Sequence, residues 1–439
     1  MTVTHRIGGT TKKLGTTGAL LMLMLLASLL TGFLPQKILT VFVAMLCVIL
    51  MFRDELYLAF PFIFFYNELY GLIFGMSVSR FVSFMLMALF CIKLVRRITV
   101  DIKYLAPITV YVLYALLVIP QYSMNRAIVS IVDIACCVFI VCEYLNKDEK
   151  NLRKFAAVYI MVALVAAGTG LWQGNIYLHG GVMPRFLATF DDPNIMGFFY
   201  TVAAFFLVSL KLFRPWLRCV LLVLLYGIIF ASLSMTALLL NIILWVVYLA
   251  ATRSINMKTA IWCLVAITVA IVAYQYGLSH PDTAVLGDLS ARVEKVISNV
   301  LVGDLNNATT GRGSLAQEHW QYFIHQPFWR ILFGGTAVNI HYISYPFDAG
   351  AHNEYIDMLL NVGLIGTCVM VGFTVGRLVN SFKQYRQTGQ EHHLCRFMVK
   401  CVWMLYCFSL PVNIFHPPEQ YFSLFLRLKP VPLFRSPYL

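Results

Sequence analysis

Long apolar runs alternate with short polar segments over most of the 439 residues. A helix needs about 20 mostly apolar residues to cross a bilayer, and runs of that length recur along the chain. They predict about 12–14 spanning helices and an all-α, polytopic membrane protein. The predicted spans are residues 17–34, 36–52, 56–75, 78–95, 104–120, 126–145, 152–172, 193–212, 217–233, 234–251, 258–276, 356–378 and 396–414.

The first apolar run has the charge pattern of a signal peptide, because Lys12 and Lys13 precede it. No small-residue cleavage site follows, however, and the second run begins almost at once. We therefore expect the first run to be a helix of the protein. Near the other end, the apolar run at 419–426 is too short to span.

Two stretches break the pattern of short connections, Gln173–Asp192 and Gly277–Glu354. Connections longer than about 12–15 residues are usually functional or disordered. Apolar residues at helical spacing predict amphipathic helices at Leu286–Leu301 and Gly313–Gln326, with Pro327 ending the second. The chain thus divides into a helical part over 1–276, a large and partly helical loop over 277–355, and a C-terminal part over 356–439.

The composition is 60% hydrophobic and 12% charged, which excludes a soluble multidomain enzyme, a disordered chain and a collagen-like chain. Most of the 33 Lys and Arg residues fall in alternate connections, which the positive-inside rule assigns to the cytoplasm. The N-terminus is then cytoplasmic, and both long stretches lie on the outer side of the membrane. The net charge of +13 reflects this topology and does not indicate nucleic-acid binding.

The 11 cysteines lie in predicted spans or on the cytoplasmic side, so we expect no disulfide framework and no zinc site. Histidines are frequent on the outer side. His319 and His325 are six residues apart and would point to different helix faces, so the sequence predicts no metal site there either.

The first cluster of outer polar residues is Met183–Gly197, where Arg185 precedes an Asp-Asp-Pro-Asn turn. Asp192 or Asp191 is expected to be the N-cap of the next helix, with a proline in its first turn. Two interpretations of this cluster remain open. Arg185 belongs to a functional site, or it only extends its charge to the membrane surface while Asn194 caps the helix.

The second cluster is Thr309–Trp320, in which glycines flank Arg312 on both sides and Thr310 can cap the following helix. Glycine lets a ligand approach the backbone closely, and a helix N-terminus favours anions. The alternative is a solvated loop arginine.

The third cluster is Ala349–Gly366, where His352, Asn353 and Glu354 precede a span and Asp357 lies one turn deeper. Histidine is the side chain best suited to exchange a proton near neutral pH, and ionisable groups at a membrane entrance are functional candidates. The alternative is a helix cap with interfacial polar residues.

The order and sidedness of these motifs resemble the O-antigen ligase/polymerase superfamily of bacterial inner-membrane glycosyltransferases. That superfamily has about a dozen helices and a large periplasmic loop, in agreement with the span count expected here. The resemblance covers roughly residues 183–366 in motif detail and the whole chain in topology. Its elements are PRFLATFDDPN, Ser232-Leu233-Ser234, TGRG followed by Trp, FGG, and AHNEYIDMLLNVGLIG.

The resemblance implies glycan transfer from an undecaprenyl-diphosphate carrier at the periplasmic face, without nucleotide sugar, metal or cofactor. Arg185 and Arg312 would then hold the diphosphate, and His352 would deprotonate or orient the acceptor hydroxyl. An arginine offers a permanent bidentate cation for the leaving phosphate. Further substrate contacts are expected from Asn194, Asn353, Glu354, Ser232, Ser234 and Asp192.

The implied partners are the undecaprenyl-diphosphate-linked oligosaccharide, a glycan or lipid A-core acceptor, membrane lipids and a chain-length regulator, with no nucleic acid. The sequence departs from the family at Met235, where an arginine often follows Ser-x-Ser. Either one diphosphate contact is lost or another cation supplies it.

Three subclasses would share the donor-side residues: a repeat-unit polymerase, a ligase that moves the finished chain to lipid A-core, and a protein O-oligosaccharyltransferase. The departure at Met235 favours the polymerase, because polymerases diverge widely. A flippase for lipid-linked sugars is an alternative from another class, and it would show broken helices and midplane charges. A purely structural assembly protein would show no dependence on any single outer residue.

Overall fold

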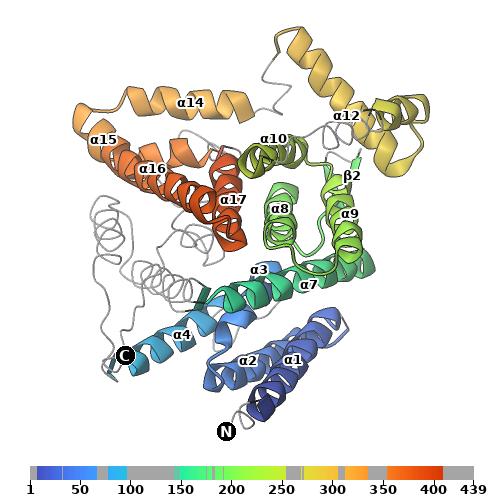
Figure 1. Cartoon of the computed structure of the whole chain (residues 1–439). Helices are drawn as coiled ribbons and strands as arrows, with labels where there is room; N and C mark the ends of the chain where they lie inside the picture. The colour runs from blue at the N-terminus through green and yellow to red at the C-terminus, as the bar shows by residue number, and fades with distance from the viewer. Residues whose placement is uncertain are drawn as a thin grey trace.

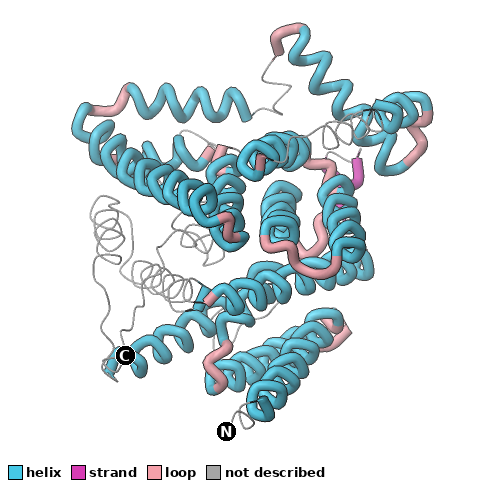
Figure 2. Tube along the Cα trace, viewed as in Figure 1, coloured by secondary structure: helices cyan, strands magenta, loops and turns pink. Residues whose placement is uncertain are grey.

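The structure is a computed structural model of the full chain, and it is built almost entirely from helices (Figures 1 and 2). The residues it describes are 7–31, 33–66, 78–95, 144–145, 148–174, 176–179, 183–190, 192–253, 268, 271–304, 312–334 and 353–408. Predictions for the span 104–120, for most of the spans 126–145 and 258–276, and for the C-terminal run at 419–426 lie outside the described residues, as do His352, Asp191 and Thr310.

The described elements follow one another along the chain with a single short hairpin between helices. They are α1 (Ile7–Leu29), α2 (Gln36–Phe52), the 3-10 helix η1 (Leu56–Ala59), α3 (Phe60–Tyr66), α4 (Val78–Val95), α7 (Glu149–Gln173), β1 (Ile176–His179), β2 (Met183–Phe186), α8 (Pro193–Ser209), α9 (Pro215–Ala231), α10 (Met235–Thr252), α12 (Ala284–Leu301), α14 (Arg312–Ile324), α15 (Phe328–Phe333), α16 (Glu354–Thr388) and α17 (Glu391–Tyr406).

Helices occupy most of the described positions where the apolar runs predict them, although α1 ends at Leu29, before the predicted end at 34, and α17 ends at Tyr406. The bounds of α2 and α4 coincide with the predicted runs, and those of α8, α9 and α10 agree closely at their first residues. Helix α16 continues to Thr388, well beyond the predicted end at 378. The helices predicted at Leu286–Leu301 and Gly313–Gln326 are confirmed as α12 and α14, and Pro327 precedes α15.

Among the described residues, three helices are long and apolar enough to cross a membrane. They are Glu149–Gln173, Met235–Thr252 and Val362–Thr388. Shorter apolar helices accompany them, including α2, α8 and α9. Many apolar side chains on α1, α2, α9 and α10 face outward, as a lipid-facing surface requires.

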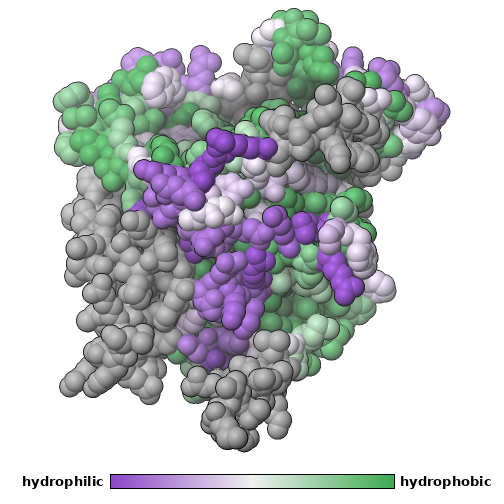
Figure 3. Space-filling view, in the orientation of Figure 1, coloured by the Kyte–Doolittle hydropathy of each residue, from purple (hydrophilic) through white to green (hydrophobic). Residues whose placement is uncertain are grey.

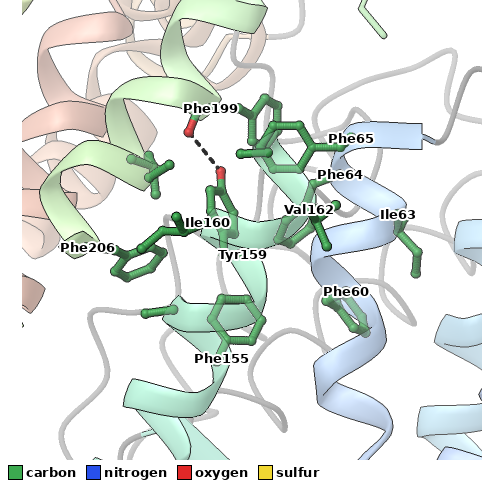
Figure 4. Packing of buried hydrophobic residues seen from close by; sticks show 14 of the residues in the cluster. Phe60, Ile63, Phe64, Phe65, Phe155, Tyr159, Ile160, Val162, Phe199 and Phe206 are labelled. Atoms are coloured by element: carbon green, nitrogen blue, oxygen red, sulfur yellow. Dashed lines mark hydrogen bonds between the residues drawn. The ribbon is translucent and has the colours of Figure 1, made fainter. Parts of the chain in front are cut away.

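Aromatic side chains from α3, α7 and α8 form the centre of the core (Figure 4). Phe65 packs edge-on against Tyr159 at a centroid distance of 5.2 Å, and its ring centroid lies 5.7 Å from that of Phe199. The Tyr159 hydroxyl donates to the carbonyl oxygen of Phe199 at 3.2 Å, which satisfies the one polar atom of this buried ring. These contacts fix the position of α8 against α7.

One end of the bundle is held by ion pairs that join the start of α7, the end of α8 and the start of α17. The Arg153 guanidinium contacts Glu391 at 2.5 Å and donates to the Leu210 carbonyl at 2.7 Å, while Lys211 contacts Glu391 at 3.0 Å. Figure 3, in the orientation of Figure 1, shows hydrophilic side chains gathered across the middle of the face turned toward the viewer. Apolar helices therefore meet in a polar layer at this end.

Candidate functional site

The first cluster predicted from the sequence forms the N-terminus of α8. The Asp192 carboxylate accepts from the backbone N–H of Asn194 at 2.6 Å and of Ile195 at 3.1 Å, and Pro193 follows as the first helical residue. The expected cap is thus Asp192, in the geometry typical of helix N-termini. Asn194 is buried, with 4% of its surface exposed.

The Ser-Leu-Ser turn forms the N-terminus of α10. The Ser232 hydroxyl donates to the Ile229 carbonyl at 2.6 Å and accepts from the Ser234 backbone N–H at 3.2 Å, so both of its hydrogen-bonding roles serve the turn. Leu233 between them has a left-handed backbone with φ 50°. The Ser234 hydroxyl accepts from the Ala237 N–H at 3.2 Å and caps the helix.

These two helix starts, distant in sequence, are joined by a hydrogen bond between predicted site residues. The Ser234 hydroxyl donates to the Asn194 side-chain oxygen at 2.6 Å, and both residues are buried. The helices approach closely here because Gly197 faces Ala237, and a Cβ added at Gly197 would lie 2.6 Å from that of Ala237. The structure therefore brings Asp192, Asn194 and Ser234 into one cluster.

A buried polar chain supports this cluster one layer deeper. The Asn241 amide donates to the Thr201 hydroxyl at 2.8 Å and to the Ala237 carbonyl at 2.8 Å. Thr201 also shares a hydrogen bond of 2.9 Å with the hydroxyl of Tyr406 on α17. Because low dielectric strengthens satisfied polar networks, this chain fixes the relative positions of α8, α10 and α17.

The third cluster reaches the same end of the bundle through α17. The Asn353 side chain caps α16 by accepting from the Tyr355 and Ile356 backbone N–H groups at 3.1 and 3.3 Å. The Glu354 backbone N–H donates to the Cys407 carbonyl at 2.8 Å, one residue beyond Tyr406. The N-terminus of α16 is thereby tied to the helix end that contacts α8 and α10. Glu354 is buried, with 2% of its surface exposed.

Arg185 lies on the short hairpin that precedes α8. It stands opposite Tyr177 in the antiparallel pair of β1 and β2, and β2 packs on α9. The turn that follows is anchored where Ala188 meets Gly170 of α7, since a Cβ on that glycine would lie 2.4 Å from the Ala188 backbone. The Thr189 hydroxyl donates to the Phe65 carbonyl. Arg185 thus sits on a segment fixed to the core.

The remaining predicted catalytic residues are placed only in part. Arg312 is the first residue of α14, which packs along α16, and its side chain lies outside the described residues, as does His352. On α14, burial lowers the pKa of His319, whose Nδ1 lies 2.7 Å from the Leu315 carbonyl. His319 therefore packs in the helix in its neutral form.

Two contributors were not predicted from the sequence. Tyr406 was counted only as part of an apolar run, since nothing local marks it as the junction of three helices. Arg292 lies in the predicted outer loop with no motif around it that indicates a role, yet its guanidinium Nη1 donates to the Leu233 carbonyl at 2.6 Å. The charge at the amphipathic helix was the available signal, but its target on α10 could not be inferred.

The arrangement favours an anionic ligand at this end of the bundle. The N-termini of α8, α10 and α16 lie at the same end, and each carries the partial positive charge of its helix dipole. Among the described residues, no group of three His, Cys, Asp or Glu side chains could hold a metal ion. The described side chains at this end offer hydrogen-bond donors and acceptors, and the Arg292 guanidinium lies beside the start of α10.

Comparison with protein families finds no match to this chain, and comparison with characterised proteins finds none either. The resemblance of the motifs to the O-antigen ligase/polymerase superfamily therefore stays a prediction.

Proposed function

We propose that the chain is a polytopic glycosyltransferase of the bacterial inner membrane that acts on undecaprenyl-diphosphate-linked glycans at the periplasmic face. The observation that carries this proposal is the convergence of three motifs, on α8, α10 and α16, at one end of an apolar bundle. The opposite end holds Arg153 and Lys211, in keeping with a cytoplasmic surface. The favoured reaction is polymerisation of surface-polysaccharide repeat units.

In the proposed reaction, the acceptor hydroxyl oxygen attacks the anomeric carbon of the donor glycan. The bond from that carbon to the phosphate oxygen breaks, and its electron pair stays on the undecaprenyl diphosphate. His352 takes the proton of the acceptor hydroxyl, and Arg185 and Arg312 stabilise the charge that develops on the leaving diphosphate. Single displacement from the opposite side inverts the anomeric centre.

The capping residues have supporting roles in this proposal. Asp192 and Asn353 hold the first turns of α8 and α16 by accepting from their backbone N–H groups, which fixes the helix starts that carry the proposed substrate contacts. Ser234 orients Asn194, and Ser232 maintains the turn before α10. Glu354 is the first residue of α16 and follows His352 by two residues in the sequence.

The test replaces His352, Arg185 and Arg312 singly by alanine in the producing strain and examines surface glycan on gels. We expect each variant to lose most of the polymeric glycan, because removing one stabilising group of this kind costs about 100-fold or more in rate. Lys295→Ala is the matched control, since Lys295 is an exposed basic residue of the same loop. If all three variants insert normally and leave chain length and amount unchanged, the enzyme proposal is wrong.

The same gels separate the alternatives. A polymerase defect leaves single repeat units on lipid A-core, whereas a ligase defect leaves no repeat units attached and accumulates carrier-linked chains. A flippase defect instead retains carrier-linked units on the cytoplasmic side. An unchanged protein-glycan profile would exclude the protein O-oligosaccharyltransferase.

A further inference from the structure

Helix α12, in the large loop, reaches the turn at the head of α10. Its Arg292 donates from Nη1 to the Leu233 carbonyl at 2.6 Å, across 59 residues of sequence. The next residue, Ser234, donates to Asn194. The guanidinium therefore lies one residue away from the bond that joins the two helix starts.

The position of Arg292 is set by close packing of α12 against the segment before it. A Cβ added at Gly277 would lie 2.2 Å from the Ser290 hydroxyl oxygen, and one added at Gly287 would lie 2.4 Å from the Pro281 carbonyl oxygen. Such approaches are possible only with glycine at both positions. These contacts fix α12 against the segment before it, and Arg292, two residues after Ser290 on the same helix, reaches the head of α10 through its hydrogen bond to the Leu233 carbonyl.

Arg292 has hydrogen-bonding capacity that its one contact leaves unused. Its Nε is buried without a hydrogen-bond partner, and no carboxylate pairs with the guanidinium among the described residues. A partly buried guanidinium has five donors, and an unpaired buried donor is costly. Within the described part of the chain, the Asn194 side-chain nitrogen is likewise not used in a hydrogen bond, although the residue is only 4% exposed.

We infer that Arg292, together with Ser234 and Asn194, forms a phosphate-binding subsite at the heads of α8 and α10. It takes one phosphate group of a lipid-linked diphosphate, so the inference rests on the proposed function. The guanidinium supplies a charge-assisted hydrogen bond, and the Asn194 amide supplies a neutral one. The Leu233 carbonyl orients the guanidinium before the ligand arrives, which lowers the ordering cost of binding.

The experiment compares binding by the purified full-length protein in detergent. The probes are undecaprenyl diphosphate, inorganic pyrophosphate and phosphatidylglycerol. Arg292→Gln keeps an N–H for the Leu233 carbonyl but removes the charge, whereas Arg292→Lys keeps both. Lys295→Gln, on the same helix, is the control, and a melting curve for each variant verifies folding.

We expect Arg292→Gln to weaken binding of undecaprenyl diphosphate and pyrophosphate by roughly tenfold or more, the loss of one charge-assisted hydrogen bond. Arg292→Lys should retain most of the affinity, and Lys295→Gln should bind as the unsubstituted protein does. A purely structural role of Arg292 would make Gln and Lys behave alike.

Three results would overturn the inference: unchanged diphosphate binding in Arg292→Gln, equal losses in Arg292→Gln and Arg292→Lys, or a loss confined to phosphatidylglycerol. These results leave the proposed function intact if His352→Ala still abolishes polymeric glycan in cells. If no variant changes surface glycan and the unsubstituted protein binds no diphosphate, both proposals are wrong.

Discussion

Two residues of the candidate site adopt left-handed backbone conformations although neither is glycine. Ala188 and Leu233 both have φ of 50°, in the turns that precede α8 and α10. Each such residue costs about 1–2 kcal/mol, and such strain persists only where the surroundings enforce it. At Ala188 the neighbour is Gly170, and at Leu233 it is the Arg292 guanidinium. The turns are thus shaped by residues distant in sequence.

At the residue scale, we predict that Ser234→Ala and Asn194→Ala are energetically coupled. Ser234→Ala removes the α10 cap and the donor to the Asn194 oxygen, and we expect a loss of about 1–3 kcal/mol in the free energy of unfolding. Once Asn194 is alanine, Ser234→Ala should cost at least about 0.5 kcal/mol less. Thermal unfolding of the two single variants and the double variant measures this coupling.

Ser298→Ala is the control for this pair, because the exposed Ser298 hydroxyl donates to the Lys295 carbonyl within its own helix. Strict additivity of the Ser234 and Asn194 variants would show that the hydrogen bond contributes nothing to stability.

At the scale of elements, the start of α16 depends on a glycine. Gly363 has φ 65° inside the helix, and a Cβ there would lie 2.4 Å from the Leu332 carbonyl oxygen and from the Gly334 nitrogen. This close approach seats α15 on α16 next to Val362, where the apolar part of the helix begins. Phe328 and Trp329 of α15 are exposed, so two aromatic side chains lie on the surface of the helix that packs against Gly363.

We predict that Gly363→Ala destabilises the protein by about 2 kcal/mol or more, since alanine meets both a left-handed backbone and an occupied space. The melting temperature in detergent checks this expectation. Gly372→Ala is the matched control on the same helix, because nothing lies within 4 Å of a Cβ there. Equal melting temperatures for the two variants would contradict the packing seen between α15 and α16.

At the scale of the whole molecule, the two ends of the bundle differ in chemistry. One end presents helix N-termini, capped by Asp192, Ser234 and Asn353. At the other end Glu391 is paired with Arg153 and Lys211. Burial would raise the pKa of Glu391, but the hydrogen bonds from these two cations outweigh it and lower the pKa. This end therefore stays ion-paired near neutral pH.

The ion-paired end also makes stability depend on pH through His393. Burial, followed by the nearby charges of His392, Arg396 and Lys400, lowers the pKa of His393 from 6.5 to about 4, against a weaker opposing effect of Glu149. Below pH 6.5 the unfolded chain takes up a proton that the folded protein does not, so stability falls as the pH is lowered toward 4. The lowered pKa values of His392 and His319 act in the same direction.

We predict that the melting temperature of the His393→Gln variant falls less than that of the unsubstituted protein when the pH is lowered from 7 toward about 4.5. Melting curves over that range measure the difference. His280→Gln, a change at an exposed histidine, is the control. An identical pH profile for His393→Gln would show that His393 titrates equally in both states.

Most of the helical architecture could be predicted because its causes are local. Apolar runs of spanning length, Pro193 after an acidic cap and the amphipathic pattern of α12 each act within a few turns of chain. The end of α16 was missed because polar residues beyond 378 continue the helix without apolar periodicity. The short hairpin carrying Arg185 was missed because its strands are only four residues long.

Local sequence patterns specify a helical, apolar protein and the polar residues that start its helices. The contacts of Ser234 with Asn194, 40 residues away, and of Arg292 with Leu233, 59 residues away, follow from the packing of the helices. A periodic pattern specifies which face of a helix is apolar but not which helix it packs against. That choice depends on close approaches such as Gly197 against Ala237, and these depend on shape in three dimensions.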